Sequence, residues 1–241
     1  TAGLALGMGT LEAIKLAKEV VSLAILFGVD VGLGFKPANP MAKLYRDAEK
    51  YVVLECLSKA VRKLEENKQV TSLIPEVSSN LAMATRYAVD LNDVAGIPGR
   101  IVKLGDRVKA VSCPGFGASR HVASAVLTAM TYNPNIRACM NIRFSDETLK
   151  ACKALGFTVS FYDRREEPAE VKSVNGRTIR WGVEQAVKRA KKFPDIIYHT
   201  GDWGKEPMVL VFGKDALEVV DKVLRIAGRI GGVKLGMGKK V

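Results

Sequence analysis

Apolar positions recur at helical spacing in the first part of the chain. One such stretch covers residues 11–27 and a second covers residues 41–66, so each is predicted to form an amphipathic helix. The glycines and prolines of residues 28–40, between the two stretches, predict a loop. The polar residues 65–71 predict a linker between this helical part and the rest of the chain.

From residue 72 onward, short apolar runs alternate with amphipathic stretches. Gly105 and Asp106 join the first two runs, and a two-residue connection of this type predicts a hairpin. Strands that alternate with helices predict a layered α/β domain, and the hairpin predicts a mixed sheet. The predicted strands are residues 101–104, 107–112, 139–144, 158–162, 196–199 and 208–212, and the predicted helices are residues 120–130, 146–155, 181–192 and 215–230.

Residues 112–130 join a glycine-rich turn to the start of a helix. Ser119 occupies the position of a helix N-cap, and Arg120 and His121 fall in the first turn. Backbone N–H groups in a first turn lack intrahelical partners, and the helix dipole is positive at that end. Because cations are electrostatically disfavoured there, the pair indicates that an anion binds beside them.

Gly115 and Gly117 in the same turn allow the backbone to approach a ligand closely. Together with the helix N-terminus they favour a phosphate-binding site. The turn matches neither the Walker A loop nor the dinucleotide fingerprint. Glycine-rich turns before helices are also common in α/β proteins, so a purely structural role stays open.

Three further loops carry polar residues that suit phosphorylated ligands. They are I-P-G-R, which ends at Arg100, D-R-R-E-E-P, which begins at Asp163, and G-D-W-G-K-E-P, which begins at Gly201. In layered α/β folds, ligands bind at the loops that follow strands. The candidate phosphate-binding and substrate-binding residues are Gly115, Gly117, Ser119, Arg120, Asn141, Arg143, Asp163, Arg164, Asp202 and Lys205.

Several of these candidates have a structural alternative. The charged residues 164–167 also fit a solvent-exposed ion-pair cluster, and Lys205 also fits an ion pair with Glu206. Asn141 also fits a backbone cap, and His199 is interpreted as structural. His121 is the better candidate for chemistry, because imidazole transfers protons near neutral pH.

Composition narrows the classes of partner. The chain has 241 residues, 48% of them hydrophobic, which is enough for a folded core. Lys and Arg outnumber Asp and Glu by 37 to 25, so the net charge of +12 predicts acidic partners. The basic residues are spread out except for Lys239-Lys240, and few aromatic residues lie among them. Phosphorylated small molecules are therefore favoured over nucleic acid.

The cysteines and the hydropathy of the chain indicate in which cellular compartment the protein is expected. The four cysteines form no C-x-x-C pair and, with two histidines, no zinc pattern, which predicts reduced thiols in an intracellular protein. The longest apolar run, residues 20–29, is half the length of a membrane span, and the chain shows no signal peptide. We therefore expect a soluble, cytoplasmic protein without a membrane partner. Because the chain begins at Thr1 in mid-pattern, we also expect a fragment of a longer protein.

Six short motifs occur in one order along the second part of the chain. They are I-P-E-V-S-S-N-L-A-M-A from Ile74, D-V-A-G-I-P-G-R from Asp93, C-P-G-F-G-A-S-R-H from Cys113, M-N-I-R-F-S from Met140, D-R-R-E-E-P from Asp163 and G-D-W-G-K-E-P from Gly201. This series resembles that of archaeal thiamine-phosphate synthases of the ThiN type, from residue 72 to about 231. Residues 1–68 resemble the last helices of a hydroxymethylpyrimidine-phosphate kinase plus a linker helix. Residues 72–241 are then the synthase domain.

The resemblance implies a fold, a reaction and roles for particular residues. The expected fold is a three-layer α/β/α domain with a mixed sheet, similar to class II aldolases. The expected reaction joins hydroxymethylpyrimidine diphosphate to a thiazole phosphate and releases pyrophosphate. Arg100 and His121 match the residues held to be essential in the family. A magnesium ion bridging the diphosphate and a homodimer are further expectations.

Two departures bear on these expectations. The glycine motif and catalytic aspartate of the kinase lie upstream of the resemblance, and G-F-K-P stands where such kinases have G-H-G-P. We therefore expect no kinase activity from this chain. Related domains also serve as non-catalytic thiamine-phosphate sensors behind a DNA-binding helix-turn-helix. Residues 41–66 predict one long helix instead of that motif, which favours the enzyme.

Overall fold

The computed structural model describes residues 1–172 and 177–237, with side chains as far as residue 231. The end of the predicted synthase domain, residues 238–241, lies outside the described residues and includes Lys239-Lys240. The chain divides into two compact units, Thr1–Val52 and Val53–Val241. The division falls within the second long helix, whereas the sequence analysis placed the boundary after residue 68.

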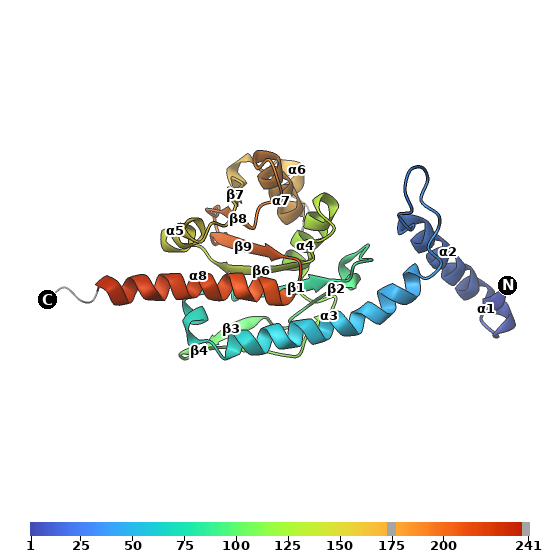
Figure 1. Cartoon of the computed structure of the whole chain (residues 1–241), viewed down its shortest axis with the longest axis horizontal. Helices are drawn as coiled ribbons and strands as arrows, with labels where there is room; N and C mark the ends of the chain where they lie inside the picture. The colour runs from blue at the N-terminus through green and yellow to red at the C-terminus, as the bar shows by residue number, and fades with distance from the viewer. Residues whose placement is uncertain (173–176, 238–241) are drawn as a thin grey trace. The chain divides into compact units, whose positions relative to one another are not determined.

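The second unit contains the sheet and most of the helices (Figure 1). The predicted strands and the longer helices occur in the predicted order, and most of their ends lie within a few residues of the predicted ones. The short strands at residues 81–84, 94–96 and 115–116 were not predicted. The strands are β1 (Leu81–Ala84), β2 (Val94–Gly96), β3 (Ile101–Leu104), β4 (Arg107–Ala110), β5 (Gly115–Phe116), β6 (Ala138–Arg143), β7 (Val159–Phe161), β8 (Ile196–His199) and β9 (Met208–Gly213). After the long helix α3 (Ala42–Glu65), the α-helices of this unit are α4 (Arg120–Tyr132), α5 (Asp146–Ala154), α6 (Ala169–Lys172), α7 (Arg177–Arg189) and α8 (Ala216–Met237). Its 3-10 helices are η1 (Lys68–Leu73), η2 (Leu91–Asp93) and η3 (Arg164–Glu166).

Seven strands form one mixed sheet in the order β5-β2-β1-β6-β9-β8-β7. Only β7 and β8 pair in parallel, and every other neighbouring pair is antiparallel. The predicted hairpin exists as β3 and β4, but it forms a separate two-stranded sheet. The hairpin was therefore the wrong reason for predicting a mixed sheet. Its side chains other than Ile101 and Val108 are at least partly exposed, so it does not suit a sheet that is covered on both faces.

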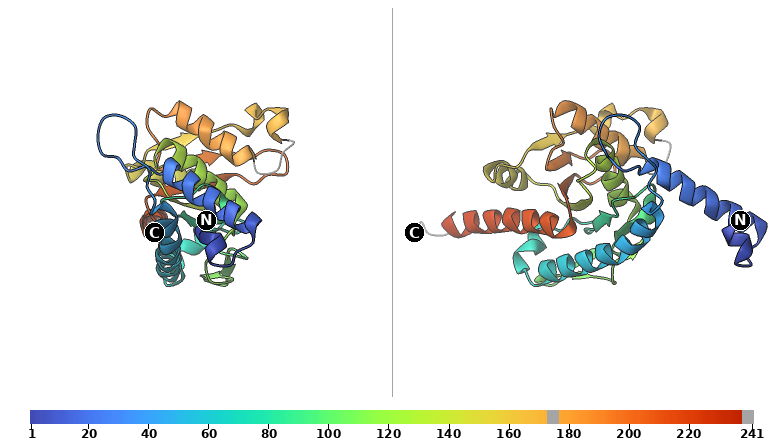
Figure 2. Two further views of the ribbon diagram at one scale, coloured as in Figure 1. Left: turned by 90° about the vertical axis from the view of Figure 1, so that its right-hand side faces the viewer. Right: turned by 45° about the vertical axis from the view of Figure 1, so that its right-hand side comes forward.

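Alternating side chains along the strands create two cores, one on each face of the large sheet. In β9, Val209 and Val211 pack in the same cluster as the buried valines of α8. Leu210 and Phe212, the residues between and after them, pack with α4 and α7. Figures 1 and 2 show these helices on opposite faces of the sheet. The predicted three-layer α/β/α fold with a mixed sheet is thus confirmed.

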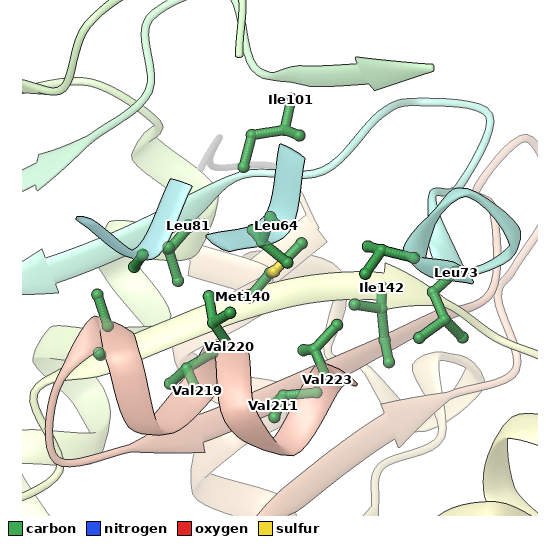
Figure 3. Packing of buried hydrophobic residues seen from close by; sticks show 14 of the residues in the cluster. Leu64, Leu73, Leu81, Ile101, Met140, Ile142, Val211, Val219, Val220 and Val223 are labelled. Atoms are coloured by element: carbon green, nitrogen blue, oxygen red, sulfur yellow. The ribbon is translucent and has the colours of Figure 1, made fainter. Parts of the chain in front are cut away.

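The segment predicted to be a linker is part of the core. Residues 65–71 run into the 3-10 helix η1, in which Val70 and Leu73 are buried. Leu64 at the end of the preceding helix is also buried, and Figure 3 shows it near β1 and β6. The linker prediction was wrong because it weighed the polar residues and not Val70 among them or Leu73 just after them, both of which are buried.

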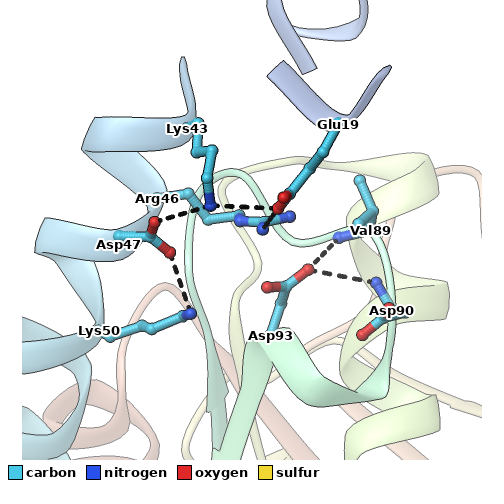
Figure 4. A network of polar contacts seen from close by, with 8 residues as sticks. All are labelled: Glu19, Lys43, Arg46, Asp47, Lys50, Val89, Asp90 and Asp93. Carbon is cyan, nitrogen blue, oxygen red and sulfur yellow. Dashed lines mark hydrogen bonds and ion pairs between the residues drawn. The ribbon is translucent and has the colours of Figure 1, made fainter. Parts of the chain in front are cut away.

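The first unit contains the helices α1 (Ala2–Ala5) and α2 (Thr10–Leu26) and the first half of α3 (Ala42–Glu65). Both long helices agree with the predicted ranges to within one residue at each end. The Glu19 carboxylate accepts hydrogen bonds from Lys43 Nζ at 3.2 Å and Arg46 Nη2 at 2.6 Å (Figure 4). Among the described residues, no helix is both long and apolar enough to cross a lipid bilayer.

Gly182 of α7 tests the packing on the α4–α7 face of the sheet. A Cβ atom at this position would lie 2.5 Å from ring carbons of the buried Tyr162. Gly182→Ala should therefore lower the free energy of unfolding by about 1–3 kcal/mol, as overpacking does. Gly228→Ala in α8 is the matched control, because its nearest contact would be an ordinary 3.6 Å. It should stabilise the protein by about 0.5–1 kcal/mol. Denaturant unfolding measures both, and equal effects would contradict this account of packing.

Candidate functional site

One cavity of about 1260 Å³ opens on the second unit and is lined by segments that are far apart in sequence. They are residues 77–80 before β1, residues 97–100 after β2, residues 116–122 at the start of α4, and parts of the loops around η3 and between β8 and β9. The four polar loops singled out in the sequence therefore meet around one space. Its volume exceeds that of a typical small-molecule site, so it has room for more than one small molecule.

Most of the predicted site residues line this cavity. Gly115, Arg143 and Asp163 do not. The predicted residues that do line it are Arg100, Gly117, Ser119, Arg120, His121, Asn141, Arg164, Asp202 and Lys205. Their proximity is a geometric finding, whereas their roles in binding and catalysis stay predictions.

The three predicted residues outside the cavity have other environments. Gly115 belongs to β5 and pairs with Gly96. Asp163 caps η3 and binds the exposed Arg165, whose hydrogen bonds lower the pKa of Asp163 to about 2. Arg143 ends β6, two residues beyond Asn141, and is exposed. The sequence identified the right loops in these cases but the wrong side chains within them.

Ser119 is the N-cap residue of α4, at the position predicted from the sequence. The helix does begin at Arg120, but Ser119 is left-handed, with φ 59° and ψ 69°, and its side chain makes no capping hydrogen bond. The first-turn N–H groups lack intrahelical partners and lie beside the cavity lining. The Gly117 N–H, in contrast, donates to the Val94 carbonyl at 3.0 Å. An anion at this helix would therefore meet the first turn of α4 and not the glycine amide.

Backbone strain is concentrated at the cavity. Among the described residues, the non-glycine residues with positive φ are Ser78 (66°), Arg100 (74°) and Ser119 (59°). All three line the cavity. Such conformations cost about 1–3 kcal/mol each and persist only where the surrounding structure enforces them. The fold therefore maintains an unfavourable backbone at three positions in loops that line the cavity.

Two asparagines hold the loops in these conformations. The Asn80 amide binds the backbone of Ile97 twice, with Nδ2 donating to the carbonyl at 2.7 Å and Oδ1 accepting from the N–H at 2.9 Å. Asn141 Oδ1 accepts from the Asn80 N–H at 2.7 Å, and its Nδ2 donates to the Ser78 carbonyl at 3.1 Å. The backbone-capping alternative for Asn141 thus describes its contacts, although it also lines the cavity.

The side chains of Arg100 and Glu206 bind the backbone of residues 76–77, in the loop before β1. The Arg100 guanidinium donates a hydrogen bond to the Val77 carbonyl. The Glu206 carboxylate accepts from the N–H groups of Glu76 at 3.0 Å and Val77 at 3.1 Å. Glu206 therefore binds backbone, and an ion pair with Lys205 is not among the contacts found in the described part of the chain.

His121 lies among cationic side chains. Its partial burial, followed by the charges of Arg100, Lys205 and Arg164, lowers its pKa below the ordinary 6.5. The imidazole is therefore neutral at pH 7. Three cations from three different loops act on one histidine, so the cavity has an electrostatic environment that favours an anion of high charge.

His199 was interpreted from the sequence as structural, yet it lines the cavity. It is buried at the end of β8, its Nδ1 accepts the Gly201 N–H at 3.1 Å, and its ring lies 5.1 Å from that of Tyr162. Burial and then the charge of Arg164 lower its pKa to about 4. Because Nδ1 accepts, the neutral ring carries its proton on Nε2. Its position at a strand end, before a polar loop, was the signal that could have identified it.

Of the carboxylates that line the cavity, those of Asp202 and Glu206 already have hydrogen-bond partners. Asp202 binds Lys172 at 3.2 Å, Glu206 binds backbone, and Glu167 lies 3.6 Å from Arg164. No group of three or more potential metal ligands occurs in the described residues. These side chains do not suit a metal ion held by the protein alone, since magnesium requires several oxygen ligands in octahedral geometry.

Comparison with known proteins agrees with this architecture. A family model described as thiamine-phosphate synthase ThiN matches residues 56–225. The chain belongs to the ThiN family. It is 36% identical over 181 residues to thiamine-phosphate synthase ThiN of Methanothermobacter thermautotrophicus (strain Delta H), covering 75% of this chain and 95% of that relative. The family named from the six sequence motifs is thus confirmed.

Two further relatives extend the comparison within the ThiN family. The chain is 42% identical over 225 residues to the bifunctional thiamine biosynthesis protein ThiDN of Methanocaldococcus jannaschii, covering 92% of this chain. It spans 50% of that relative's length. A crystal structure of the C-terminal domain of phosphomethylpyrimidine kinase aligns with a TM-score of 0.70 and 50% identity, covering 74% of this chain and all of that domain.

The low pKa of His199 predicts a pH dependence of stability in this ThiN domain. The unfolded histidine, with a pKa near 6.5, binds its proton more tightly than the folded one, with a pKa of about 4. The free energy of unfolding should therefore fall by up to about 3 kcal/mol as the pH drops from about 6.5 to about 4. His199→Asn keeps an acceptor for Gly201 but does not titrate. Denaturant unfolding at several pH values should show a weaker acid dependence for the variant, and identical curves would contradict the assignment.

Proposed function

We propose that the chain is a thiamine-phosphate synthase, a transferase that joins hydroxymethylpyrimidine diphosphate to a thiazole phosphate and releases pyrophosphate. The observation that carries this proposal is the convergence of Arg100, Arg164 and Lys205 around His121 in one cavity. Membership of the ThiN family and the names of its relatives support the same reaction.

The proposed reaction requires positive charge where this cavity supplies it. The bond between the pyrimidinylmethyl carbon and the diphosphate oxygen breaks, and its electron pair leaves with pyrophosphate. The lone pair of the thiazole nitrogen forms the new carbon–nitrogen bond. Negative charge grows on the leaving group, so cations fixed in advance stabilise the transition state more than the substrates. Arginines are suited to this role because they bind phosphoryl oxygens through two parallel N–H groups.

Each side chain then has a distinct task. Arg100 and Arg120 bind phosphoryl oxygens, and the first-turn amides of α4 add further donors. His121 is neutral before the substrate binds. The diphosphate offsets the charges of Arg100, Lys205 and Arg164, which raises the pKa of His121 toward its ordinary value, so that it donates a hydrogen bond or a proton to the departing pyrophosphate.

The remaining expectations are part of the same proposal. A magnesium ion, if required, arrives with the diphosphate, which together with water supplies its oxygen ligands. The partners are phosphorylated small molecules and a second copy of the chain in a homodimer, with no nucleic acid and no membrane, in the cytoplasm. The lack of kinase activity in residues 1–68 stays a prediction.

Substitution of the central pair tests the proposal. Arg100→Ala and His121→Ala should each lower turnover by about 10²–10³-fold, the effect of removing one donor to a developing anion, while the variants stay folded by circular dichroism. Arg165→Ala is the control, because Arg165 is exposed, binds Asp163 and does not line the cavity. Formation of thiamine phosphate from the two substrates is the readout. Near-normal turnover of either cavity variant, or a purified wild-type chain that binds both substrates without forming product, would refute the proposal.

The pKa of His121 gives a second test, which does not need turnover. Binding of inorganic pyrophosphate should raise this pKa, so the protein takes up protons on binding near pH 6. Calorimetry in two buffers of different ionisation enthalpy measures the uptake. Subtracting the value for His121→Asn removes the contribution of pyrophosphate itself. A difference of zero between wild type and variant would show that the anion does not reach His121.

A further inference from the structure

Glu167 is a buried carboxylate with unused hydrogen-bonding capacity. The residue is 5% exposed, lies between η3 and α6, and belongs to the lining of the cavity. Its nearest cation, Arg164 Nη2, stands 3.6 Å away, which is an ion-pair distance but too long for a hydrogen bond. Within the described part of the chain, neither carboxylate oxygen has a hydrogen-bond partner. Buried carboxylates without such partners are rare in native proteins. We therefore expect a ligand to donate a hydrogen bond to the Glu167 carboxylate.

The surroundings define which donor fits. Arg164 already offsets the negative charge of Glu167, so the ligand does not need to be a cation. A phosphate would be repelled by the carboxylate, and a metal ion would be repelled by Arg164. A neutral N–H donor remains, because an ionised carboxylate accepts about four hydrogen bonds and donates none.

Nearby groups favour a flat polar ring. The Tyr162 hydroxyl is also buried without a hydrogen-bond partner among residues 1–172 and 177–231, and the charges of both Arg164 and Glu167 act on it. His199 packs against the Tyr162 ring. Ile179 and Leu210 add apolar surface to the same cavity lining. Apolar walls with a few buried polar groups are typical of sites for heteroaromatic ligands.

We infer that Glu167 recognises the amino group of the pyrimidine substrate, and that the pyrimidine ring binds beside Arg164 and Glu167 with its diphosphate directed toward Arg100 and His121. This inference rests on the proposed function. Of the two substrates, only the aminopyrimidine carries an N–H donor on its ring, since the thiazole phosphate has none. Glu167 is thus a specificity-determining residue that distinguishes the two rings, and the thiazole takes the remaining part of the cavity.

The test compares hydroxymethylpyrimidine diphosphate with an analogue that lacks the amino group. For each protein, calorimetry gives the ratio of the two dissociation constants. A substitution that weakens only diphosphate binding raises both constants equally and leaves this ratio unchanged. The wild-type protein should prefer the amino compound by about 10- to 100-fold, the effect of leaving a buried carboxylate unsatisfied. Glu167→Gln should show a smaller preference, and Glu167→Leu should show almost none. Glu166→Gln is the control, since Glu166 binds Arg189 at the surface and should keep the wild-type ratio.

The outcomes separate this inference from the proposed function. Binding of inorganic pyrophosphate and of the thiazole phosphate should change less than threefold in Glu167→Gln, whereas a merely structural role would weaken all ligands together. An unchanged amino preference in both Glu167 variants would overturn the inference, even if the wild-type protein forms thiamine phosphate. A wild-type protein that shows the predicted preference but forms no product would refute the proposed function and leave this assignment standing.

Discussion

Repulsion between like charges is the constraint on which the site depends. Arg100, Arg164 and Lys205 come from three loops, yet all of them act on the imidazole of His121. At effective dielectric constants near those of protein surfaces, unit charges a few ångströms apart interact by several kcal/mol. Such a cluster persists because the rest of the fold holds its loops in place, and it is relieved when a polyanion binds. In the proposed function, the architecture thus has its cationic groups in place before the diphosphate binds.

The sheet supplies the rigidity that this arrangement requires. Asn80 and Asn141 stand at or beside central strands and bind backbone groups of the neighbouring loops. Strained backbone at Ser78, Arg100 and Ser119 is then enforced by strands with cores on both faces. Preorganisation of this kind contributes to catalysis because the charges do not need to rearrange during the reaction. The same rigidity explains how loops separated by more than a hundred residues line one cavity.

The sequence predicts elements well and individual contacts poorly. Apolar periodicity locates the longer helices and the strands β3, β4, β6, β7, β8 and β9, since it reflects burial on one or two faces. It does not locate β1, β2 and β5, which have only four, three and two residues. It fails at residues 65–71, where the buried Val70 lies among polar residues, two positions before the buried Leu73. Within D-R-R-E-E-P, only the three-dimensional path of η3 decides that Asp163 binds Arg165 outside the cavity while Arg164 and Glu167 line it. Glu167 was not among the predicted site residues, because its run of four charged residues has the same composition as a solvent-exposed ion-pair cluster.

The central claim is that one diphosphate binds where these loops converge. A crystal structure of the protein grown with pyrophosphate tests it most directly. The account predicts phosphoryl oxygens within hydrogen-bond distance of the Arg100 guanidinium, the His121 imidazole and the first-turn amides of α4. Pyrophosphate bound elsewhere on the protein, with Arg100 and His121 making no contact to it, would contradict the account.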